Sequence, residues 1–139
     1  MKLQRSKPDR ERGGSVAEFA LLAPVFVVLL FGMVEFGLAM YAKGVITNAS
    51  REGARLGVVY GTPRKTEAEI IARIREYLNK AGFYATPEVT IDVTGEGGSS
   101  GTTLTVSVSY PYTFQVLPRF VQGLTGTRNI SANTKMLME

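Results

Sequence analysis

The chain has 139 residues without cysteine or histidine, which removes disulfides, the common zinc sites and the Ser-His and Cys-His nucleophile pairs. Its net charge is +4, but five basic and two acidic residues lie in positions 1–13 and the remainder is close to neutral. We therefore expect no enzyme, metal, other cofactor or nucleic-acid partner. Without disulfides, a small core needs support from an anchor or from partners.

Residues 19–41 are an apolar run with one charge in twenty-three positions. As a helix they span roughly 34 Å, enough for one crossing of a hydrocarbon core of about 30 Å. The basic residues in 1–13 place the N-terminus in the cytoplasm and everything beyond the run on the other side. The run exceeds the roughly 7–15 apolar residues of a secretory signal, so a retained anchor is favoured.

The helical pattern continues past the apolar run, because no proline occurs between it and Pro63. Small residues recur at every fourth position: Ala49, Gly53, Gly57 and Gly61. This spacing places them on one face, where a second backbone can approach closely. The alternative is that the glycines only loosen the helix; we favour close packing. We predict one helix over 14–61, about 72 Å long, whose second half stands outside the membrane.

Residues 62–139 predict a small exported α+β module. Thr66 and Glu69 form a capping-box pattern ahead of an amphipathic helix over 67–81. Its apolar stripe consists of Ile70, Ile71, Ile74, Tyr77, Leu78 and Ala81. Such a stripe is typical of a helix that packs on a sheet.

Three strands follow, in the stretches 88–94, 102–110 and 128–138. Apolar and polar residues alternate in each stretch, which predicts a three-stranded antiparallel sheet with one face packed and one exposed. Residues 95–101 form a flexible hairpin loop in this prediction. Residues 111–127 form a long connection, which is either functional or a flap over the core. The expected fold is thus a long transmembrane helix followed by one helix and three strands.

Two carboxylates lie in or beside the apolar run. A carboxylate at the centre of a membrane helix costs roughly 2.5–3.5 kcal/mol, which makes each a candidate functional residue. Glu35 lies near the outer end of the run and is a possible intramembrane polar site. The alternative is that its carboxylate only snorkels to the interface, without a function. Glu18 follows Gly13 and Gly14, and it would be the fifth residue of a chain cut after Gly13.

The stretch "RGGSVAEF" (12–19) resembles a type IV prepilin leader. The stretch 13–57 is similar to the TadE-like family through "VAEFALLAP", which contains Pro24, "EFG" and "NASREGAR". The resemblance implies a prepilin peptidase cut between Gly13 and Gly14, and pairing of Glu18 with the terminal amine of a neighbouring subunit. Pro24 removes one backbone hydrogen bond, so we expect a kink or local unwinding there.

The resemblance further implies a minor pseudopilin of a tight adherence (Flp-type) pilus, acting in assembly, initiation or capping, with a pilin-like fold. Its partners would be the prepilin peptidase, other pilins and pseudopilins, the pilus assembly machinery and membrane lipid. It would lie in the bacterial inner membrane with the module in the periplasm, and could enter an extracellular pilus. One alternative is an uncleaved anchor that displays a binding module. A tethered enzyme would need a polar cluster that residues 62–139 do not show.

Overall fold

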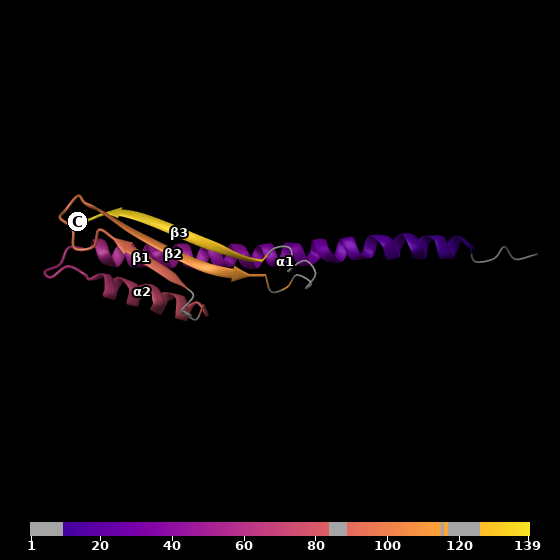
Figure 1. Ribbon diagram of the computed structural model, residues 1–139, viewed down its shortest axis with the longest axis horizontal. Helices are drawn as coiled ribbons and strands as arrows, with labels where there is room; N and C mark the ends of the chain where they lie inside the picture. The colour runs from indigo at the N-terminus through magenta and orange to yellow at the C-terminus, as the bar shows by residue number, and fades with distance from the viewer. Residues whose placement is uncertain (1–9, 84–88, 115, 117–125) are drawn as a thin grey trace, which may run out of the picture.

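The computed structural model describes residues 10–83, 89–114, 116 and 126–139. Helix α1 (Arg10–Val58) has 49 residues and is about 74 Å long. Its N-terminal half projects away from the rest of the chain (Figure 1). α1 runs through Pro24 as an unbroken α-helix, so of the two expected effects, a kink or local unwinding, the unwinding does not occur. One missing N–H donor leaves the turns on either side intact.

The end of α1 lies at Val58, so Gly61 is beyond the helix. The carbonyl oxygen of Val58 accepts a hydrogen bond from the backbone N–H of Glu139 at 3.1 Å. This contact satisfies one of the four carbonyl groups that a helix end leaves without an internal partner. It also joins the far end of α1 to the residues that follow the last strand.

Helix α2 (Glu67–Lys80) forms where the capping box predicted it. Thr66 Oγ1 accepts from the Glu69 backbone N–H at 3.4 Å, and the Glu69 carboxylate accepts from the Thr66 N–H at 2.9 Å. Ile70, Ile74 and Leu78 are fully buried. The predicted stripe is therefore the face that packs.

The three strands are β1 (Thr90–Thr94), β2 (Thr103–Thr113) and β3 (Thr127–Leu137). They form an antiparallel sheet in the order β1-β2-β3. Burial alternates along β2, so one face of the sheet is packed. α1 contacts β2 and β3, and α2 contacts both α1 and β1. This α+β pilin-like arrangement confirms the predicted fold class.

β2 is longer than the sequence predicts and includes Pro111, Tyr112 and Thr113. The pairing of β1 with β2 ends at Ser109, while β3 stays paired with β2 as far as Thr113. Among the described residues, β3 is therefore the strand that pairs with β2 from Tyr110 onwards, and a proline is tolerated where no second strand pairs alongside. Residues 115 and 117–125 of the predicted connection lie outside the described residues.

The packed face of α1 begins halfway along the helix. Glu35 is its first buried residue, the next is Ala42, and from there buried positions recur every three or four residues as far as Val58. That interval keeps one face of α1 directed at the sheet. The module thus covers the second half of α1 along its length, as Figure 1 shows.

Candidate functional sites on the long helix

The first half of α1 is an uncovered apolar segment, residues 13–34. Phe19, Leu21 and Met33 are 72%, 77% and 71% exposed, and the other large side chains are also exposed or partly so. These residues extend over about 33 Å as a helix, which matches a hydrocarbon core of about 30 Å. In the described part of the chain, one helix, Gly13–Val58, is long and apolar enough to cross a membrane.

The predicted cleavage and pairing residues lie at the start of this segment. Gly13 and Gly14 are helical and exposed, and a single turn of α1 precedes them. Glu18 follows one turn later and is also exposed. The structure therefore places all three on the half of α1 that the module leaves uncovered.

Glu35 lies where the covered half of α1 begins. Its side chain is 2% exposed, and the Tyr112 hydroxyl donates to Oε1 at 2.6 Å. The backbone N–H of Val116 donates to Oε2, also at 2.6 Å. The Glu35 side chain is thus directed into the module, whereas snorkelling would direct its carboxylate to the membrane interface. Burial, and then the hydrogen bond to Glu35, raise the pKa of Tyr112, so its hydroxyl remains a donor at neutral pH.

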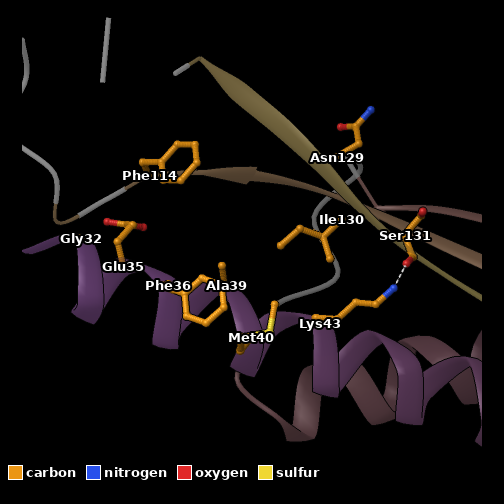
Figure 2. Close-up of a pocket in the computed structure, with 10 residues that line it drawn as sticks. All are labelled: Gly32, Glu35, Phe36, Ala39, Met40, Lys43, Phe114, Asn129, Ile130 and Ser131. Atoms are coloured by element: carbon orange, nitrogen blue, oxygen red, sulfur yellow. Dashed lines mark hydrogen bonds between the residues drawn. The ribbon is translucent and has the colours of Figure 1, made fainter. Parts of the chain in front are cut away.

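A groove of about 670 Å³ opens beside Glu35, between α1, the end of β2 and the start of β3. Figure 2 shows the side chains around it. The groove is lined by Gly32, Glu35, Phe36, Ala39, Met40 and Lys43 of α1, by Phe114, and by Asn129, Ile130 and Ser131 of β3. Most of this lining is apolar, and the ammonium group of Lys43 lies at one end, where it donates to the Ser131 carbonyl oxygen.

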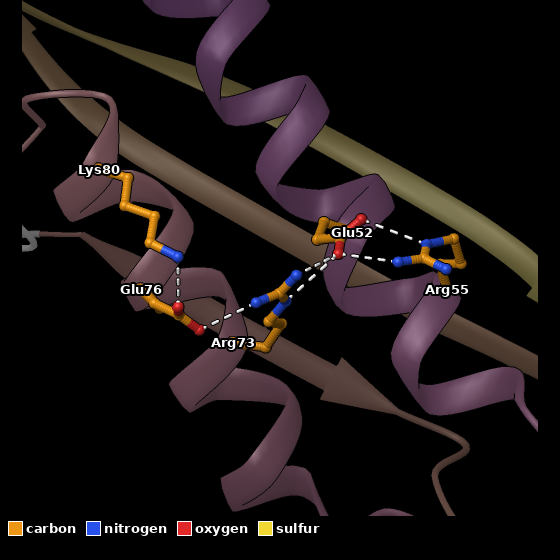
Figure 3. A network of polar contacts seen from close by, with 5 residues as sticks. All are labelled: Glu52, Arg55, Arg73, Glu76 and Lys80. Atoms are coloured by element: carbon orange, nitrogen blue, oxygen red, sulfur yellow. Dashed lines mark hydrogen bonds and ion pairs between the residues drawn. The ribbon is translucent and has the colours of Figure 1, made fainter.

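The stretch 48–55 of α1 attaches the helix to the sheet and to α2. Ser50 is fully buried, and its Oγ lies 2.7 Å from Thr134 Oγ1 of β3. Glu52 accepts from Arg73 of α2 at 2.7 Å and from Arg55 at 3.0 Å (Figure 3). The hydrogen bonds from Arg55 and then from Arg73 lower the pKa of Glu52 to about 2. This polar stretch therefore has a structural role within the chain.

Three of the four predicted small packing residues lie under the module. Ala49 is fully buried. A Cβ atom at Gly53 would lie 2.5 Å from Ile74 Cγ1, and one at Gly57 would lie 2.5 Å from Leu104 Cδ2. The close approach at these positions is therefore to side chains of the same chain, whereas Gly61 lies beyond α1.

The comparison with known families matches these features of α1. A family model described as TadE-like protein matches residues 13–55. Over these residues the chain is similar to the TadE-like protein family. The TadE-like match begins at the first of the paired glycines, includes Glu18 and Glu35, and ends within the polar stretch that holds the module. No curated protein and no solved structure matches the chain.

Sequence reasoning identified Glu35 but missed the groups that bind it. The apolar alternation of β2 passes through Val106, Val108 and Tyr110 and reaches Tyr112, which is 7% exposed. Extending that alternation past Pro111 would have predicted an inward-facing tyrosine. Its contact with a residue 77 positions earlier depends on how the sheet lies along α1 and has no local signal.

Proposed function

We propose that this chain is a minor pseudopilin of a tight adherence (Flp-type) pilus system, acting in assembly, initiation or capping. A prepilin peptidase cuts it between Gly13 and Gly14, and its N-terminal helix packs among those of other pilins and pseudopilins. The observation that carries the proposal is the TadE-like match, which begins at Gly13 and continues through the whole uncovered half of α1.

The start of α1 suits a cleavage site. Only one helical turn precedes Gly13, and each glycine makes a helix less stable than alanine would by about 1 kcal/mol. The paired glycines therefore make the first turns easy to unwind. Because neither glycine has a side chain, the extended backbone can enter the active site of a peptidase.

The uncovered half of α1 suits assembly with other helices. Its large side chains are apolar, and most of them are exposed. The carboxylate of Glu18 would cost free energy in these apolar surroundings unless it were paired with a positive group. Cleavage after Gly13 creates a positive terminal amine, and the amine of a neighbouring subunit would supply that partner.

The proposed location is the bacterial inner membrane. Five basic residues precede the apolar segment, which favours a cytoplasmic N-terminus and a periplasmic module. The pilus assembly machinery of that membrane is the proposed partner, and the processed chain would leave the membrane with the filament.

N-terminal sequencing of the membrane-extracted protein tests the processing step. In cells that carry a prepilin peptidase we expect the sequence to start at Gly14, and in cells without it at Met1. Gly13→Asp should also leave Met1 in place, because the carboxylate does not fit where glycine does. A start at Met1 in the presence of the peptidase would contradict the proposal and favour the uncleaved anchor.

Pilus counts test the assembly step in a strain that carries the tight adherence apparatus. We expect Glu18→Ala to be cut normally but to reduce the number of pili several-fold, because its carboxylate no longer pairs with an amine. Glu96→Ala is the matched control, since Glu96 is exposed in the β1–β2 loop. Equal pilus numbers in both variants would rule out the pairing role.

A further inference from the structure

The groove beside Glu35 lies at the level where α1 leaves the membrane. The apolar run 19–41 spans roughly 34 Å as a helix, so the hydrocarbon core ends close to Tyr41. The part of α1 from Gly32 to Lys43, which crosses this level, forms one wall of the groove over roughly 16 Å. The apolar end of the groove is therefore continuous with the membrane-facing surface of α1.

The two ends of the groove differ in chemistry. Phe36 and Phe114 lie at the end nearest the membrane, together with Gly32 and the Glu35 carboxylate, whose oxygens accept hydrogen bonds from Tyr112 and Val116. Lys43 and Ser131 lie at the other end, where Figure 2 shows their hydrogen bond. The lining thus changes from apolar to cationic in the direction that leads away from the hydrocarbon core.

We infer that this groove binds one phospholipid molecule from the leaflet on the module side, with its acyl chain along the apolar end and its phosphate against Lys43. A volume of about 670 Å³ lies within the range of roughly 300–1,000 Å³ found for ligand sites. An ammonium group has three N–H donors, so Lys43 can bind a phosphate oxygen while it donates to Ser131.

The position of Lys43 fits the depth of the phosphate. Its Cα lies two residues, or about 3 Å, beyond the apolar run 19–41, and Figure 2 shows its ammonium directed along α1 away from Gly32, toward Ser131. The headgroup layer adds about 5–7 Å to each side of the hydrocarbon core. Glu35 does not oppose an anion there, because it lies at the other end and accepts hydrogen bonds from Tyr112 and Val116. This inference does not depend on the pilus proposal.

Native mass spectrometry of the full-length chain in detergent tests the inference. We expect one dioleoylphosphatidylglycerol to stay bound, while dioleoylglycerol, which lacks the phosphate, and glycerol 3-phosphate, which lacks the chains, are lost. Lys43→Gln should weaken the binding of the phospholipid about tenfold, as expected for one charge-assisted hydrogen bond. Lys135→Gln is the control, because Lys135 is exposed on β3 outside the groove.

A second pair of variants compares a substitution that fills the groove with one that lies outside it. Among the described residues, a Cβ atom built at Gly32 or at Gly37 meets no other segment within 4 Å, and of these two glycines Gly32 alone lines the groove. Gly32→Leu should abolish the bound lipid, and Gly37→Leu should not. Equal lipid retention by all variants, or retention of dioleoylglycerol as tight as that of the phospholipid, would overturn the inference. So would a dimer that Gly32→Leu separates, because a second copy would then occupy the groove.

Discussion

Two glycines of α1 should respond in opposite directions to the same substitution. A Cβ atom at Gly53 would lie 2.5 Å from Cγ1 and 2.6 Å from Cδ1 of Ile74, whereas carbon atoms in contact are about 3.5–4.0 Å apart. Ile74 is fully buried, so it cannot move away freely. A Cβ atom at Gly44 would meet no other segment of the described chain within 4 Å.

The expected changes in the free energy of unfolding follow from these distances. Overpacking at Gly53 costs about 1–3 kcal/mol, and the gain in helix propensity from glycine to alanine offsets about 1 kcal/mol of it. Gly53→Ala should therefore lower the stability by up to about 2 kcal/mol. Gly44→Ala brings only the gain in helix propensity, so it should raise the stability by up to about 1 kcal/mol.

Urea unfolding of the full-length chain in detergent, followed by the near-ultraviolet circular dichroism of its tyrosines, measures both variants. The two should differ by about 1–3 kcal/mol, the whole difference arising from contact with Ile74. If both substitutions raise the stability equally, the module does not lie against Gly53 and the arrangement of α1 and α2 described above is refuted.

Two further predictions concern polar contacts of α1. Tyr112→Phe removes the donor to the buried Glu35 and should lower the free energy of unfolding by about 1.5–3 kcal/mol in the same assay. Tyr110→Phe, on the same strand, is the control. Equal losses of stability in the two variants would contradict the contact. The pKa of Glu52 is lowered from 4.5 to about 2, so its contribution to stability is complete above about pH 4.5 and is lost as the pH falls toward 2. Glu52→Gln should flatten that acid decline, and an unchanged pH profile would show that the ion pairs with Arg55 and Arg73 contribute nothing.

Local patterns predicted much of this fold. The capping box at Thr66 and Glu69 placed the start of α2 within one residue, because a cap depends on groups only three positions apart. The alternation of apolar residues predicted the three strands and their antiparallel sheet. It failed at Pro111, since tolerance of a proline depends on whether a second strand pairs alongside, and that depends on where β1 begins.

The long-range contacts of α1 could not be predicted in the same way. The spacing of Gly53 and Gly57 indicated a close approach but did not identify what approaches, because a neighbouring helix and the chain's own α2 need the same small residues. For Glu35, the cost of a carboxylate in an apolar helix indicated that something must bind it. Its donors are distant in sequence, and only the packed sheet brings Tyr112 to that level of α1.

The covered half of α1 and the strands beside it have the same length, and this match has a mechanical consequence. From Glu35 to Val58 the helix rises about 36 Å, and the eleven residues of β2 and of β3 extend over about 36 Å as well. A force along the helix axis would load the contacts between Glu35 and Val58 in shear, so that many must break together. Bending is then confined to the uncovered half of α1, which contains Pro24, while the covered half transmits tension as a stiff rod.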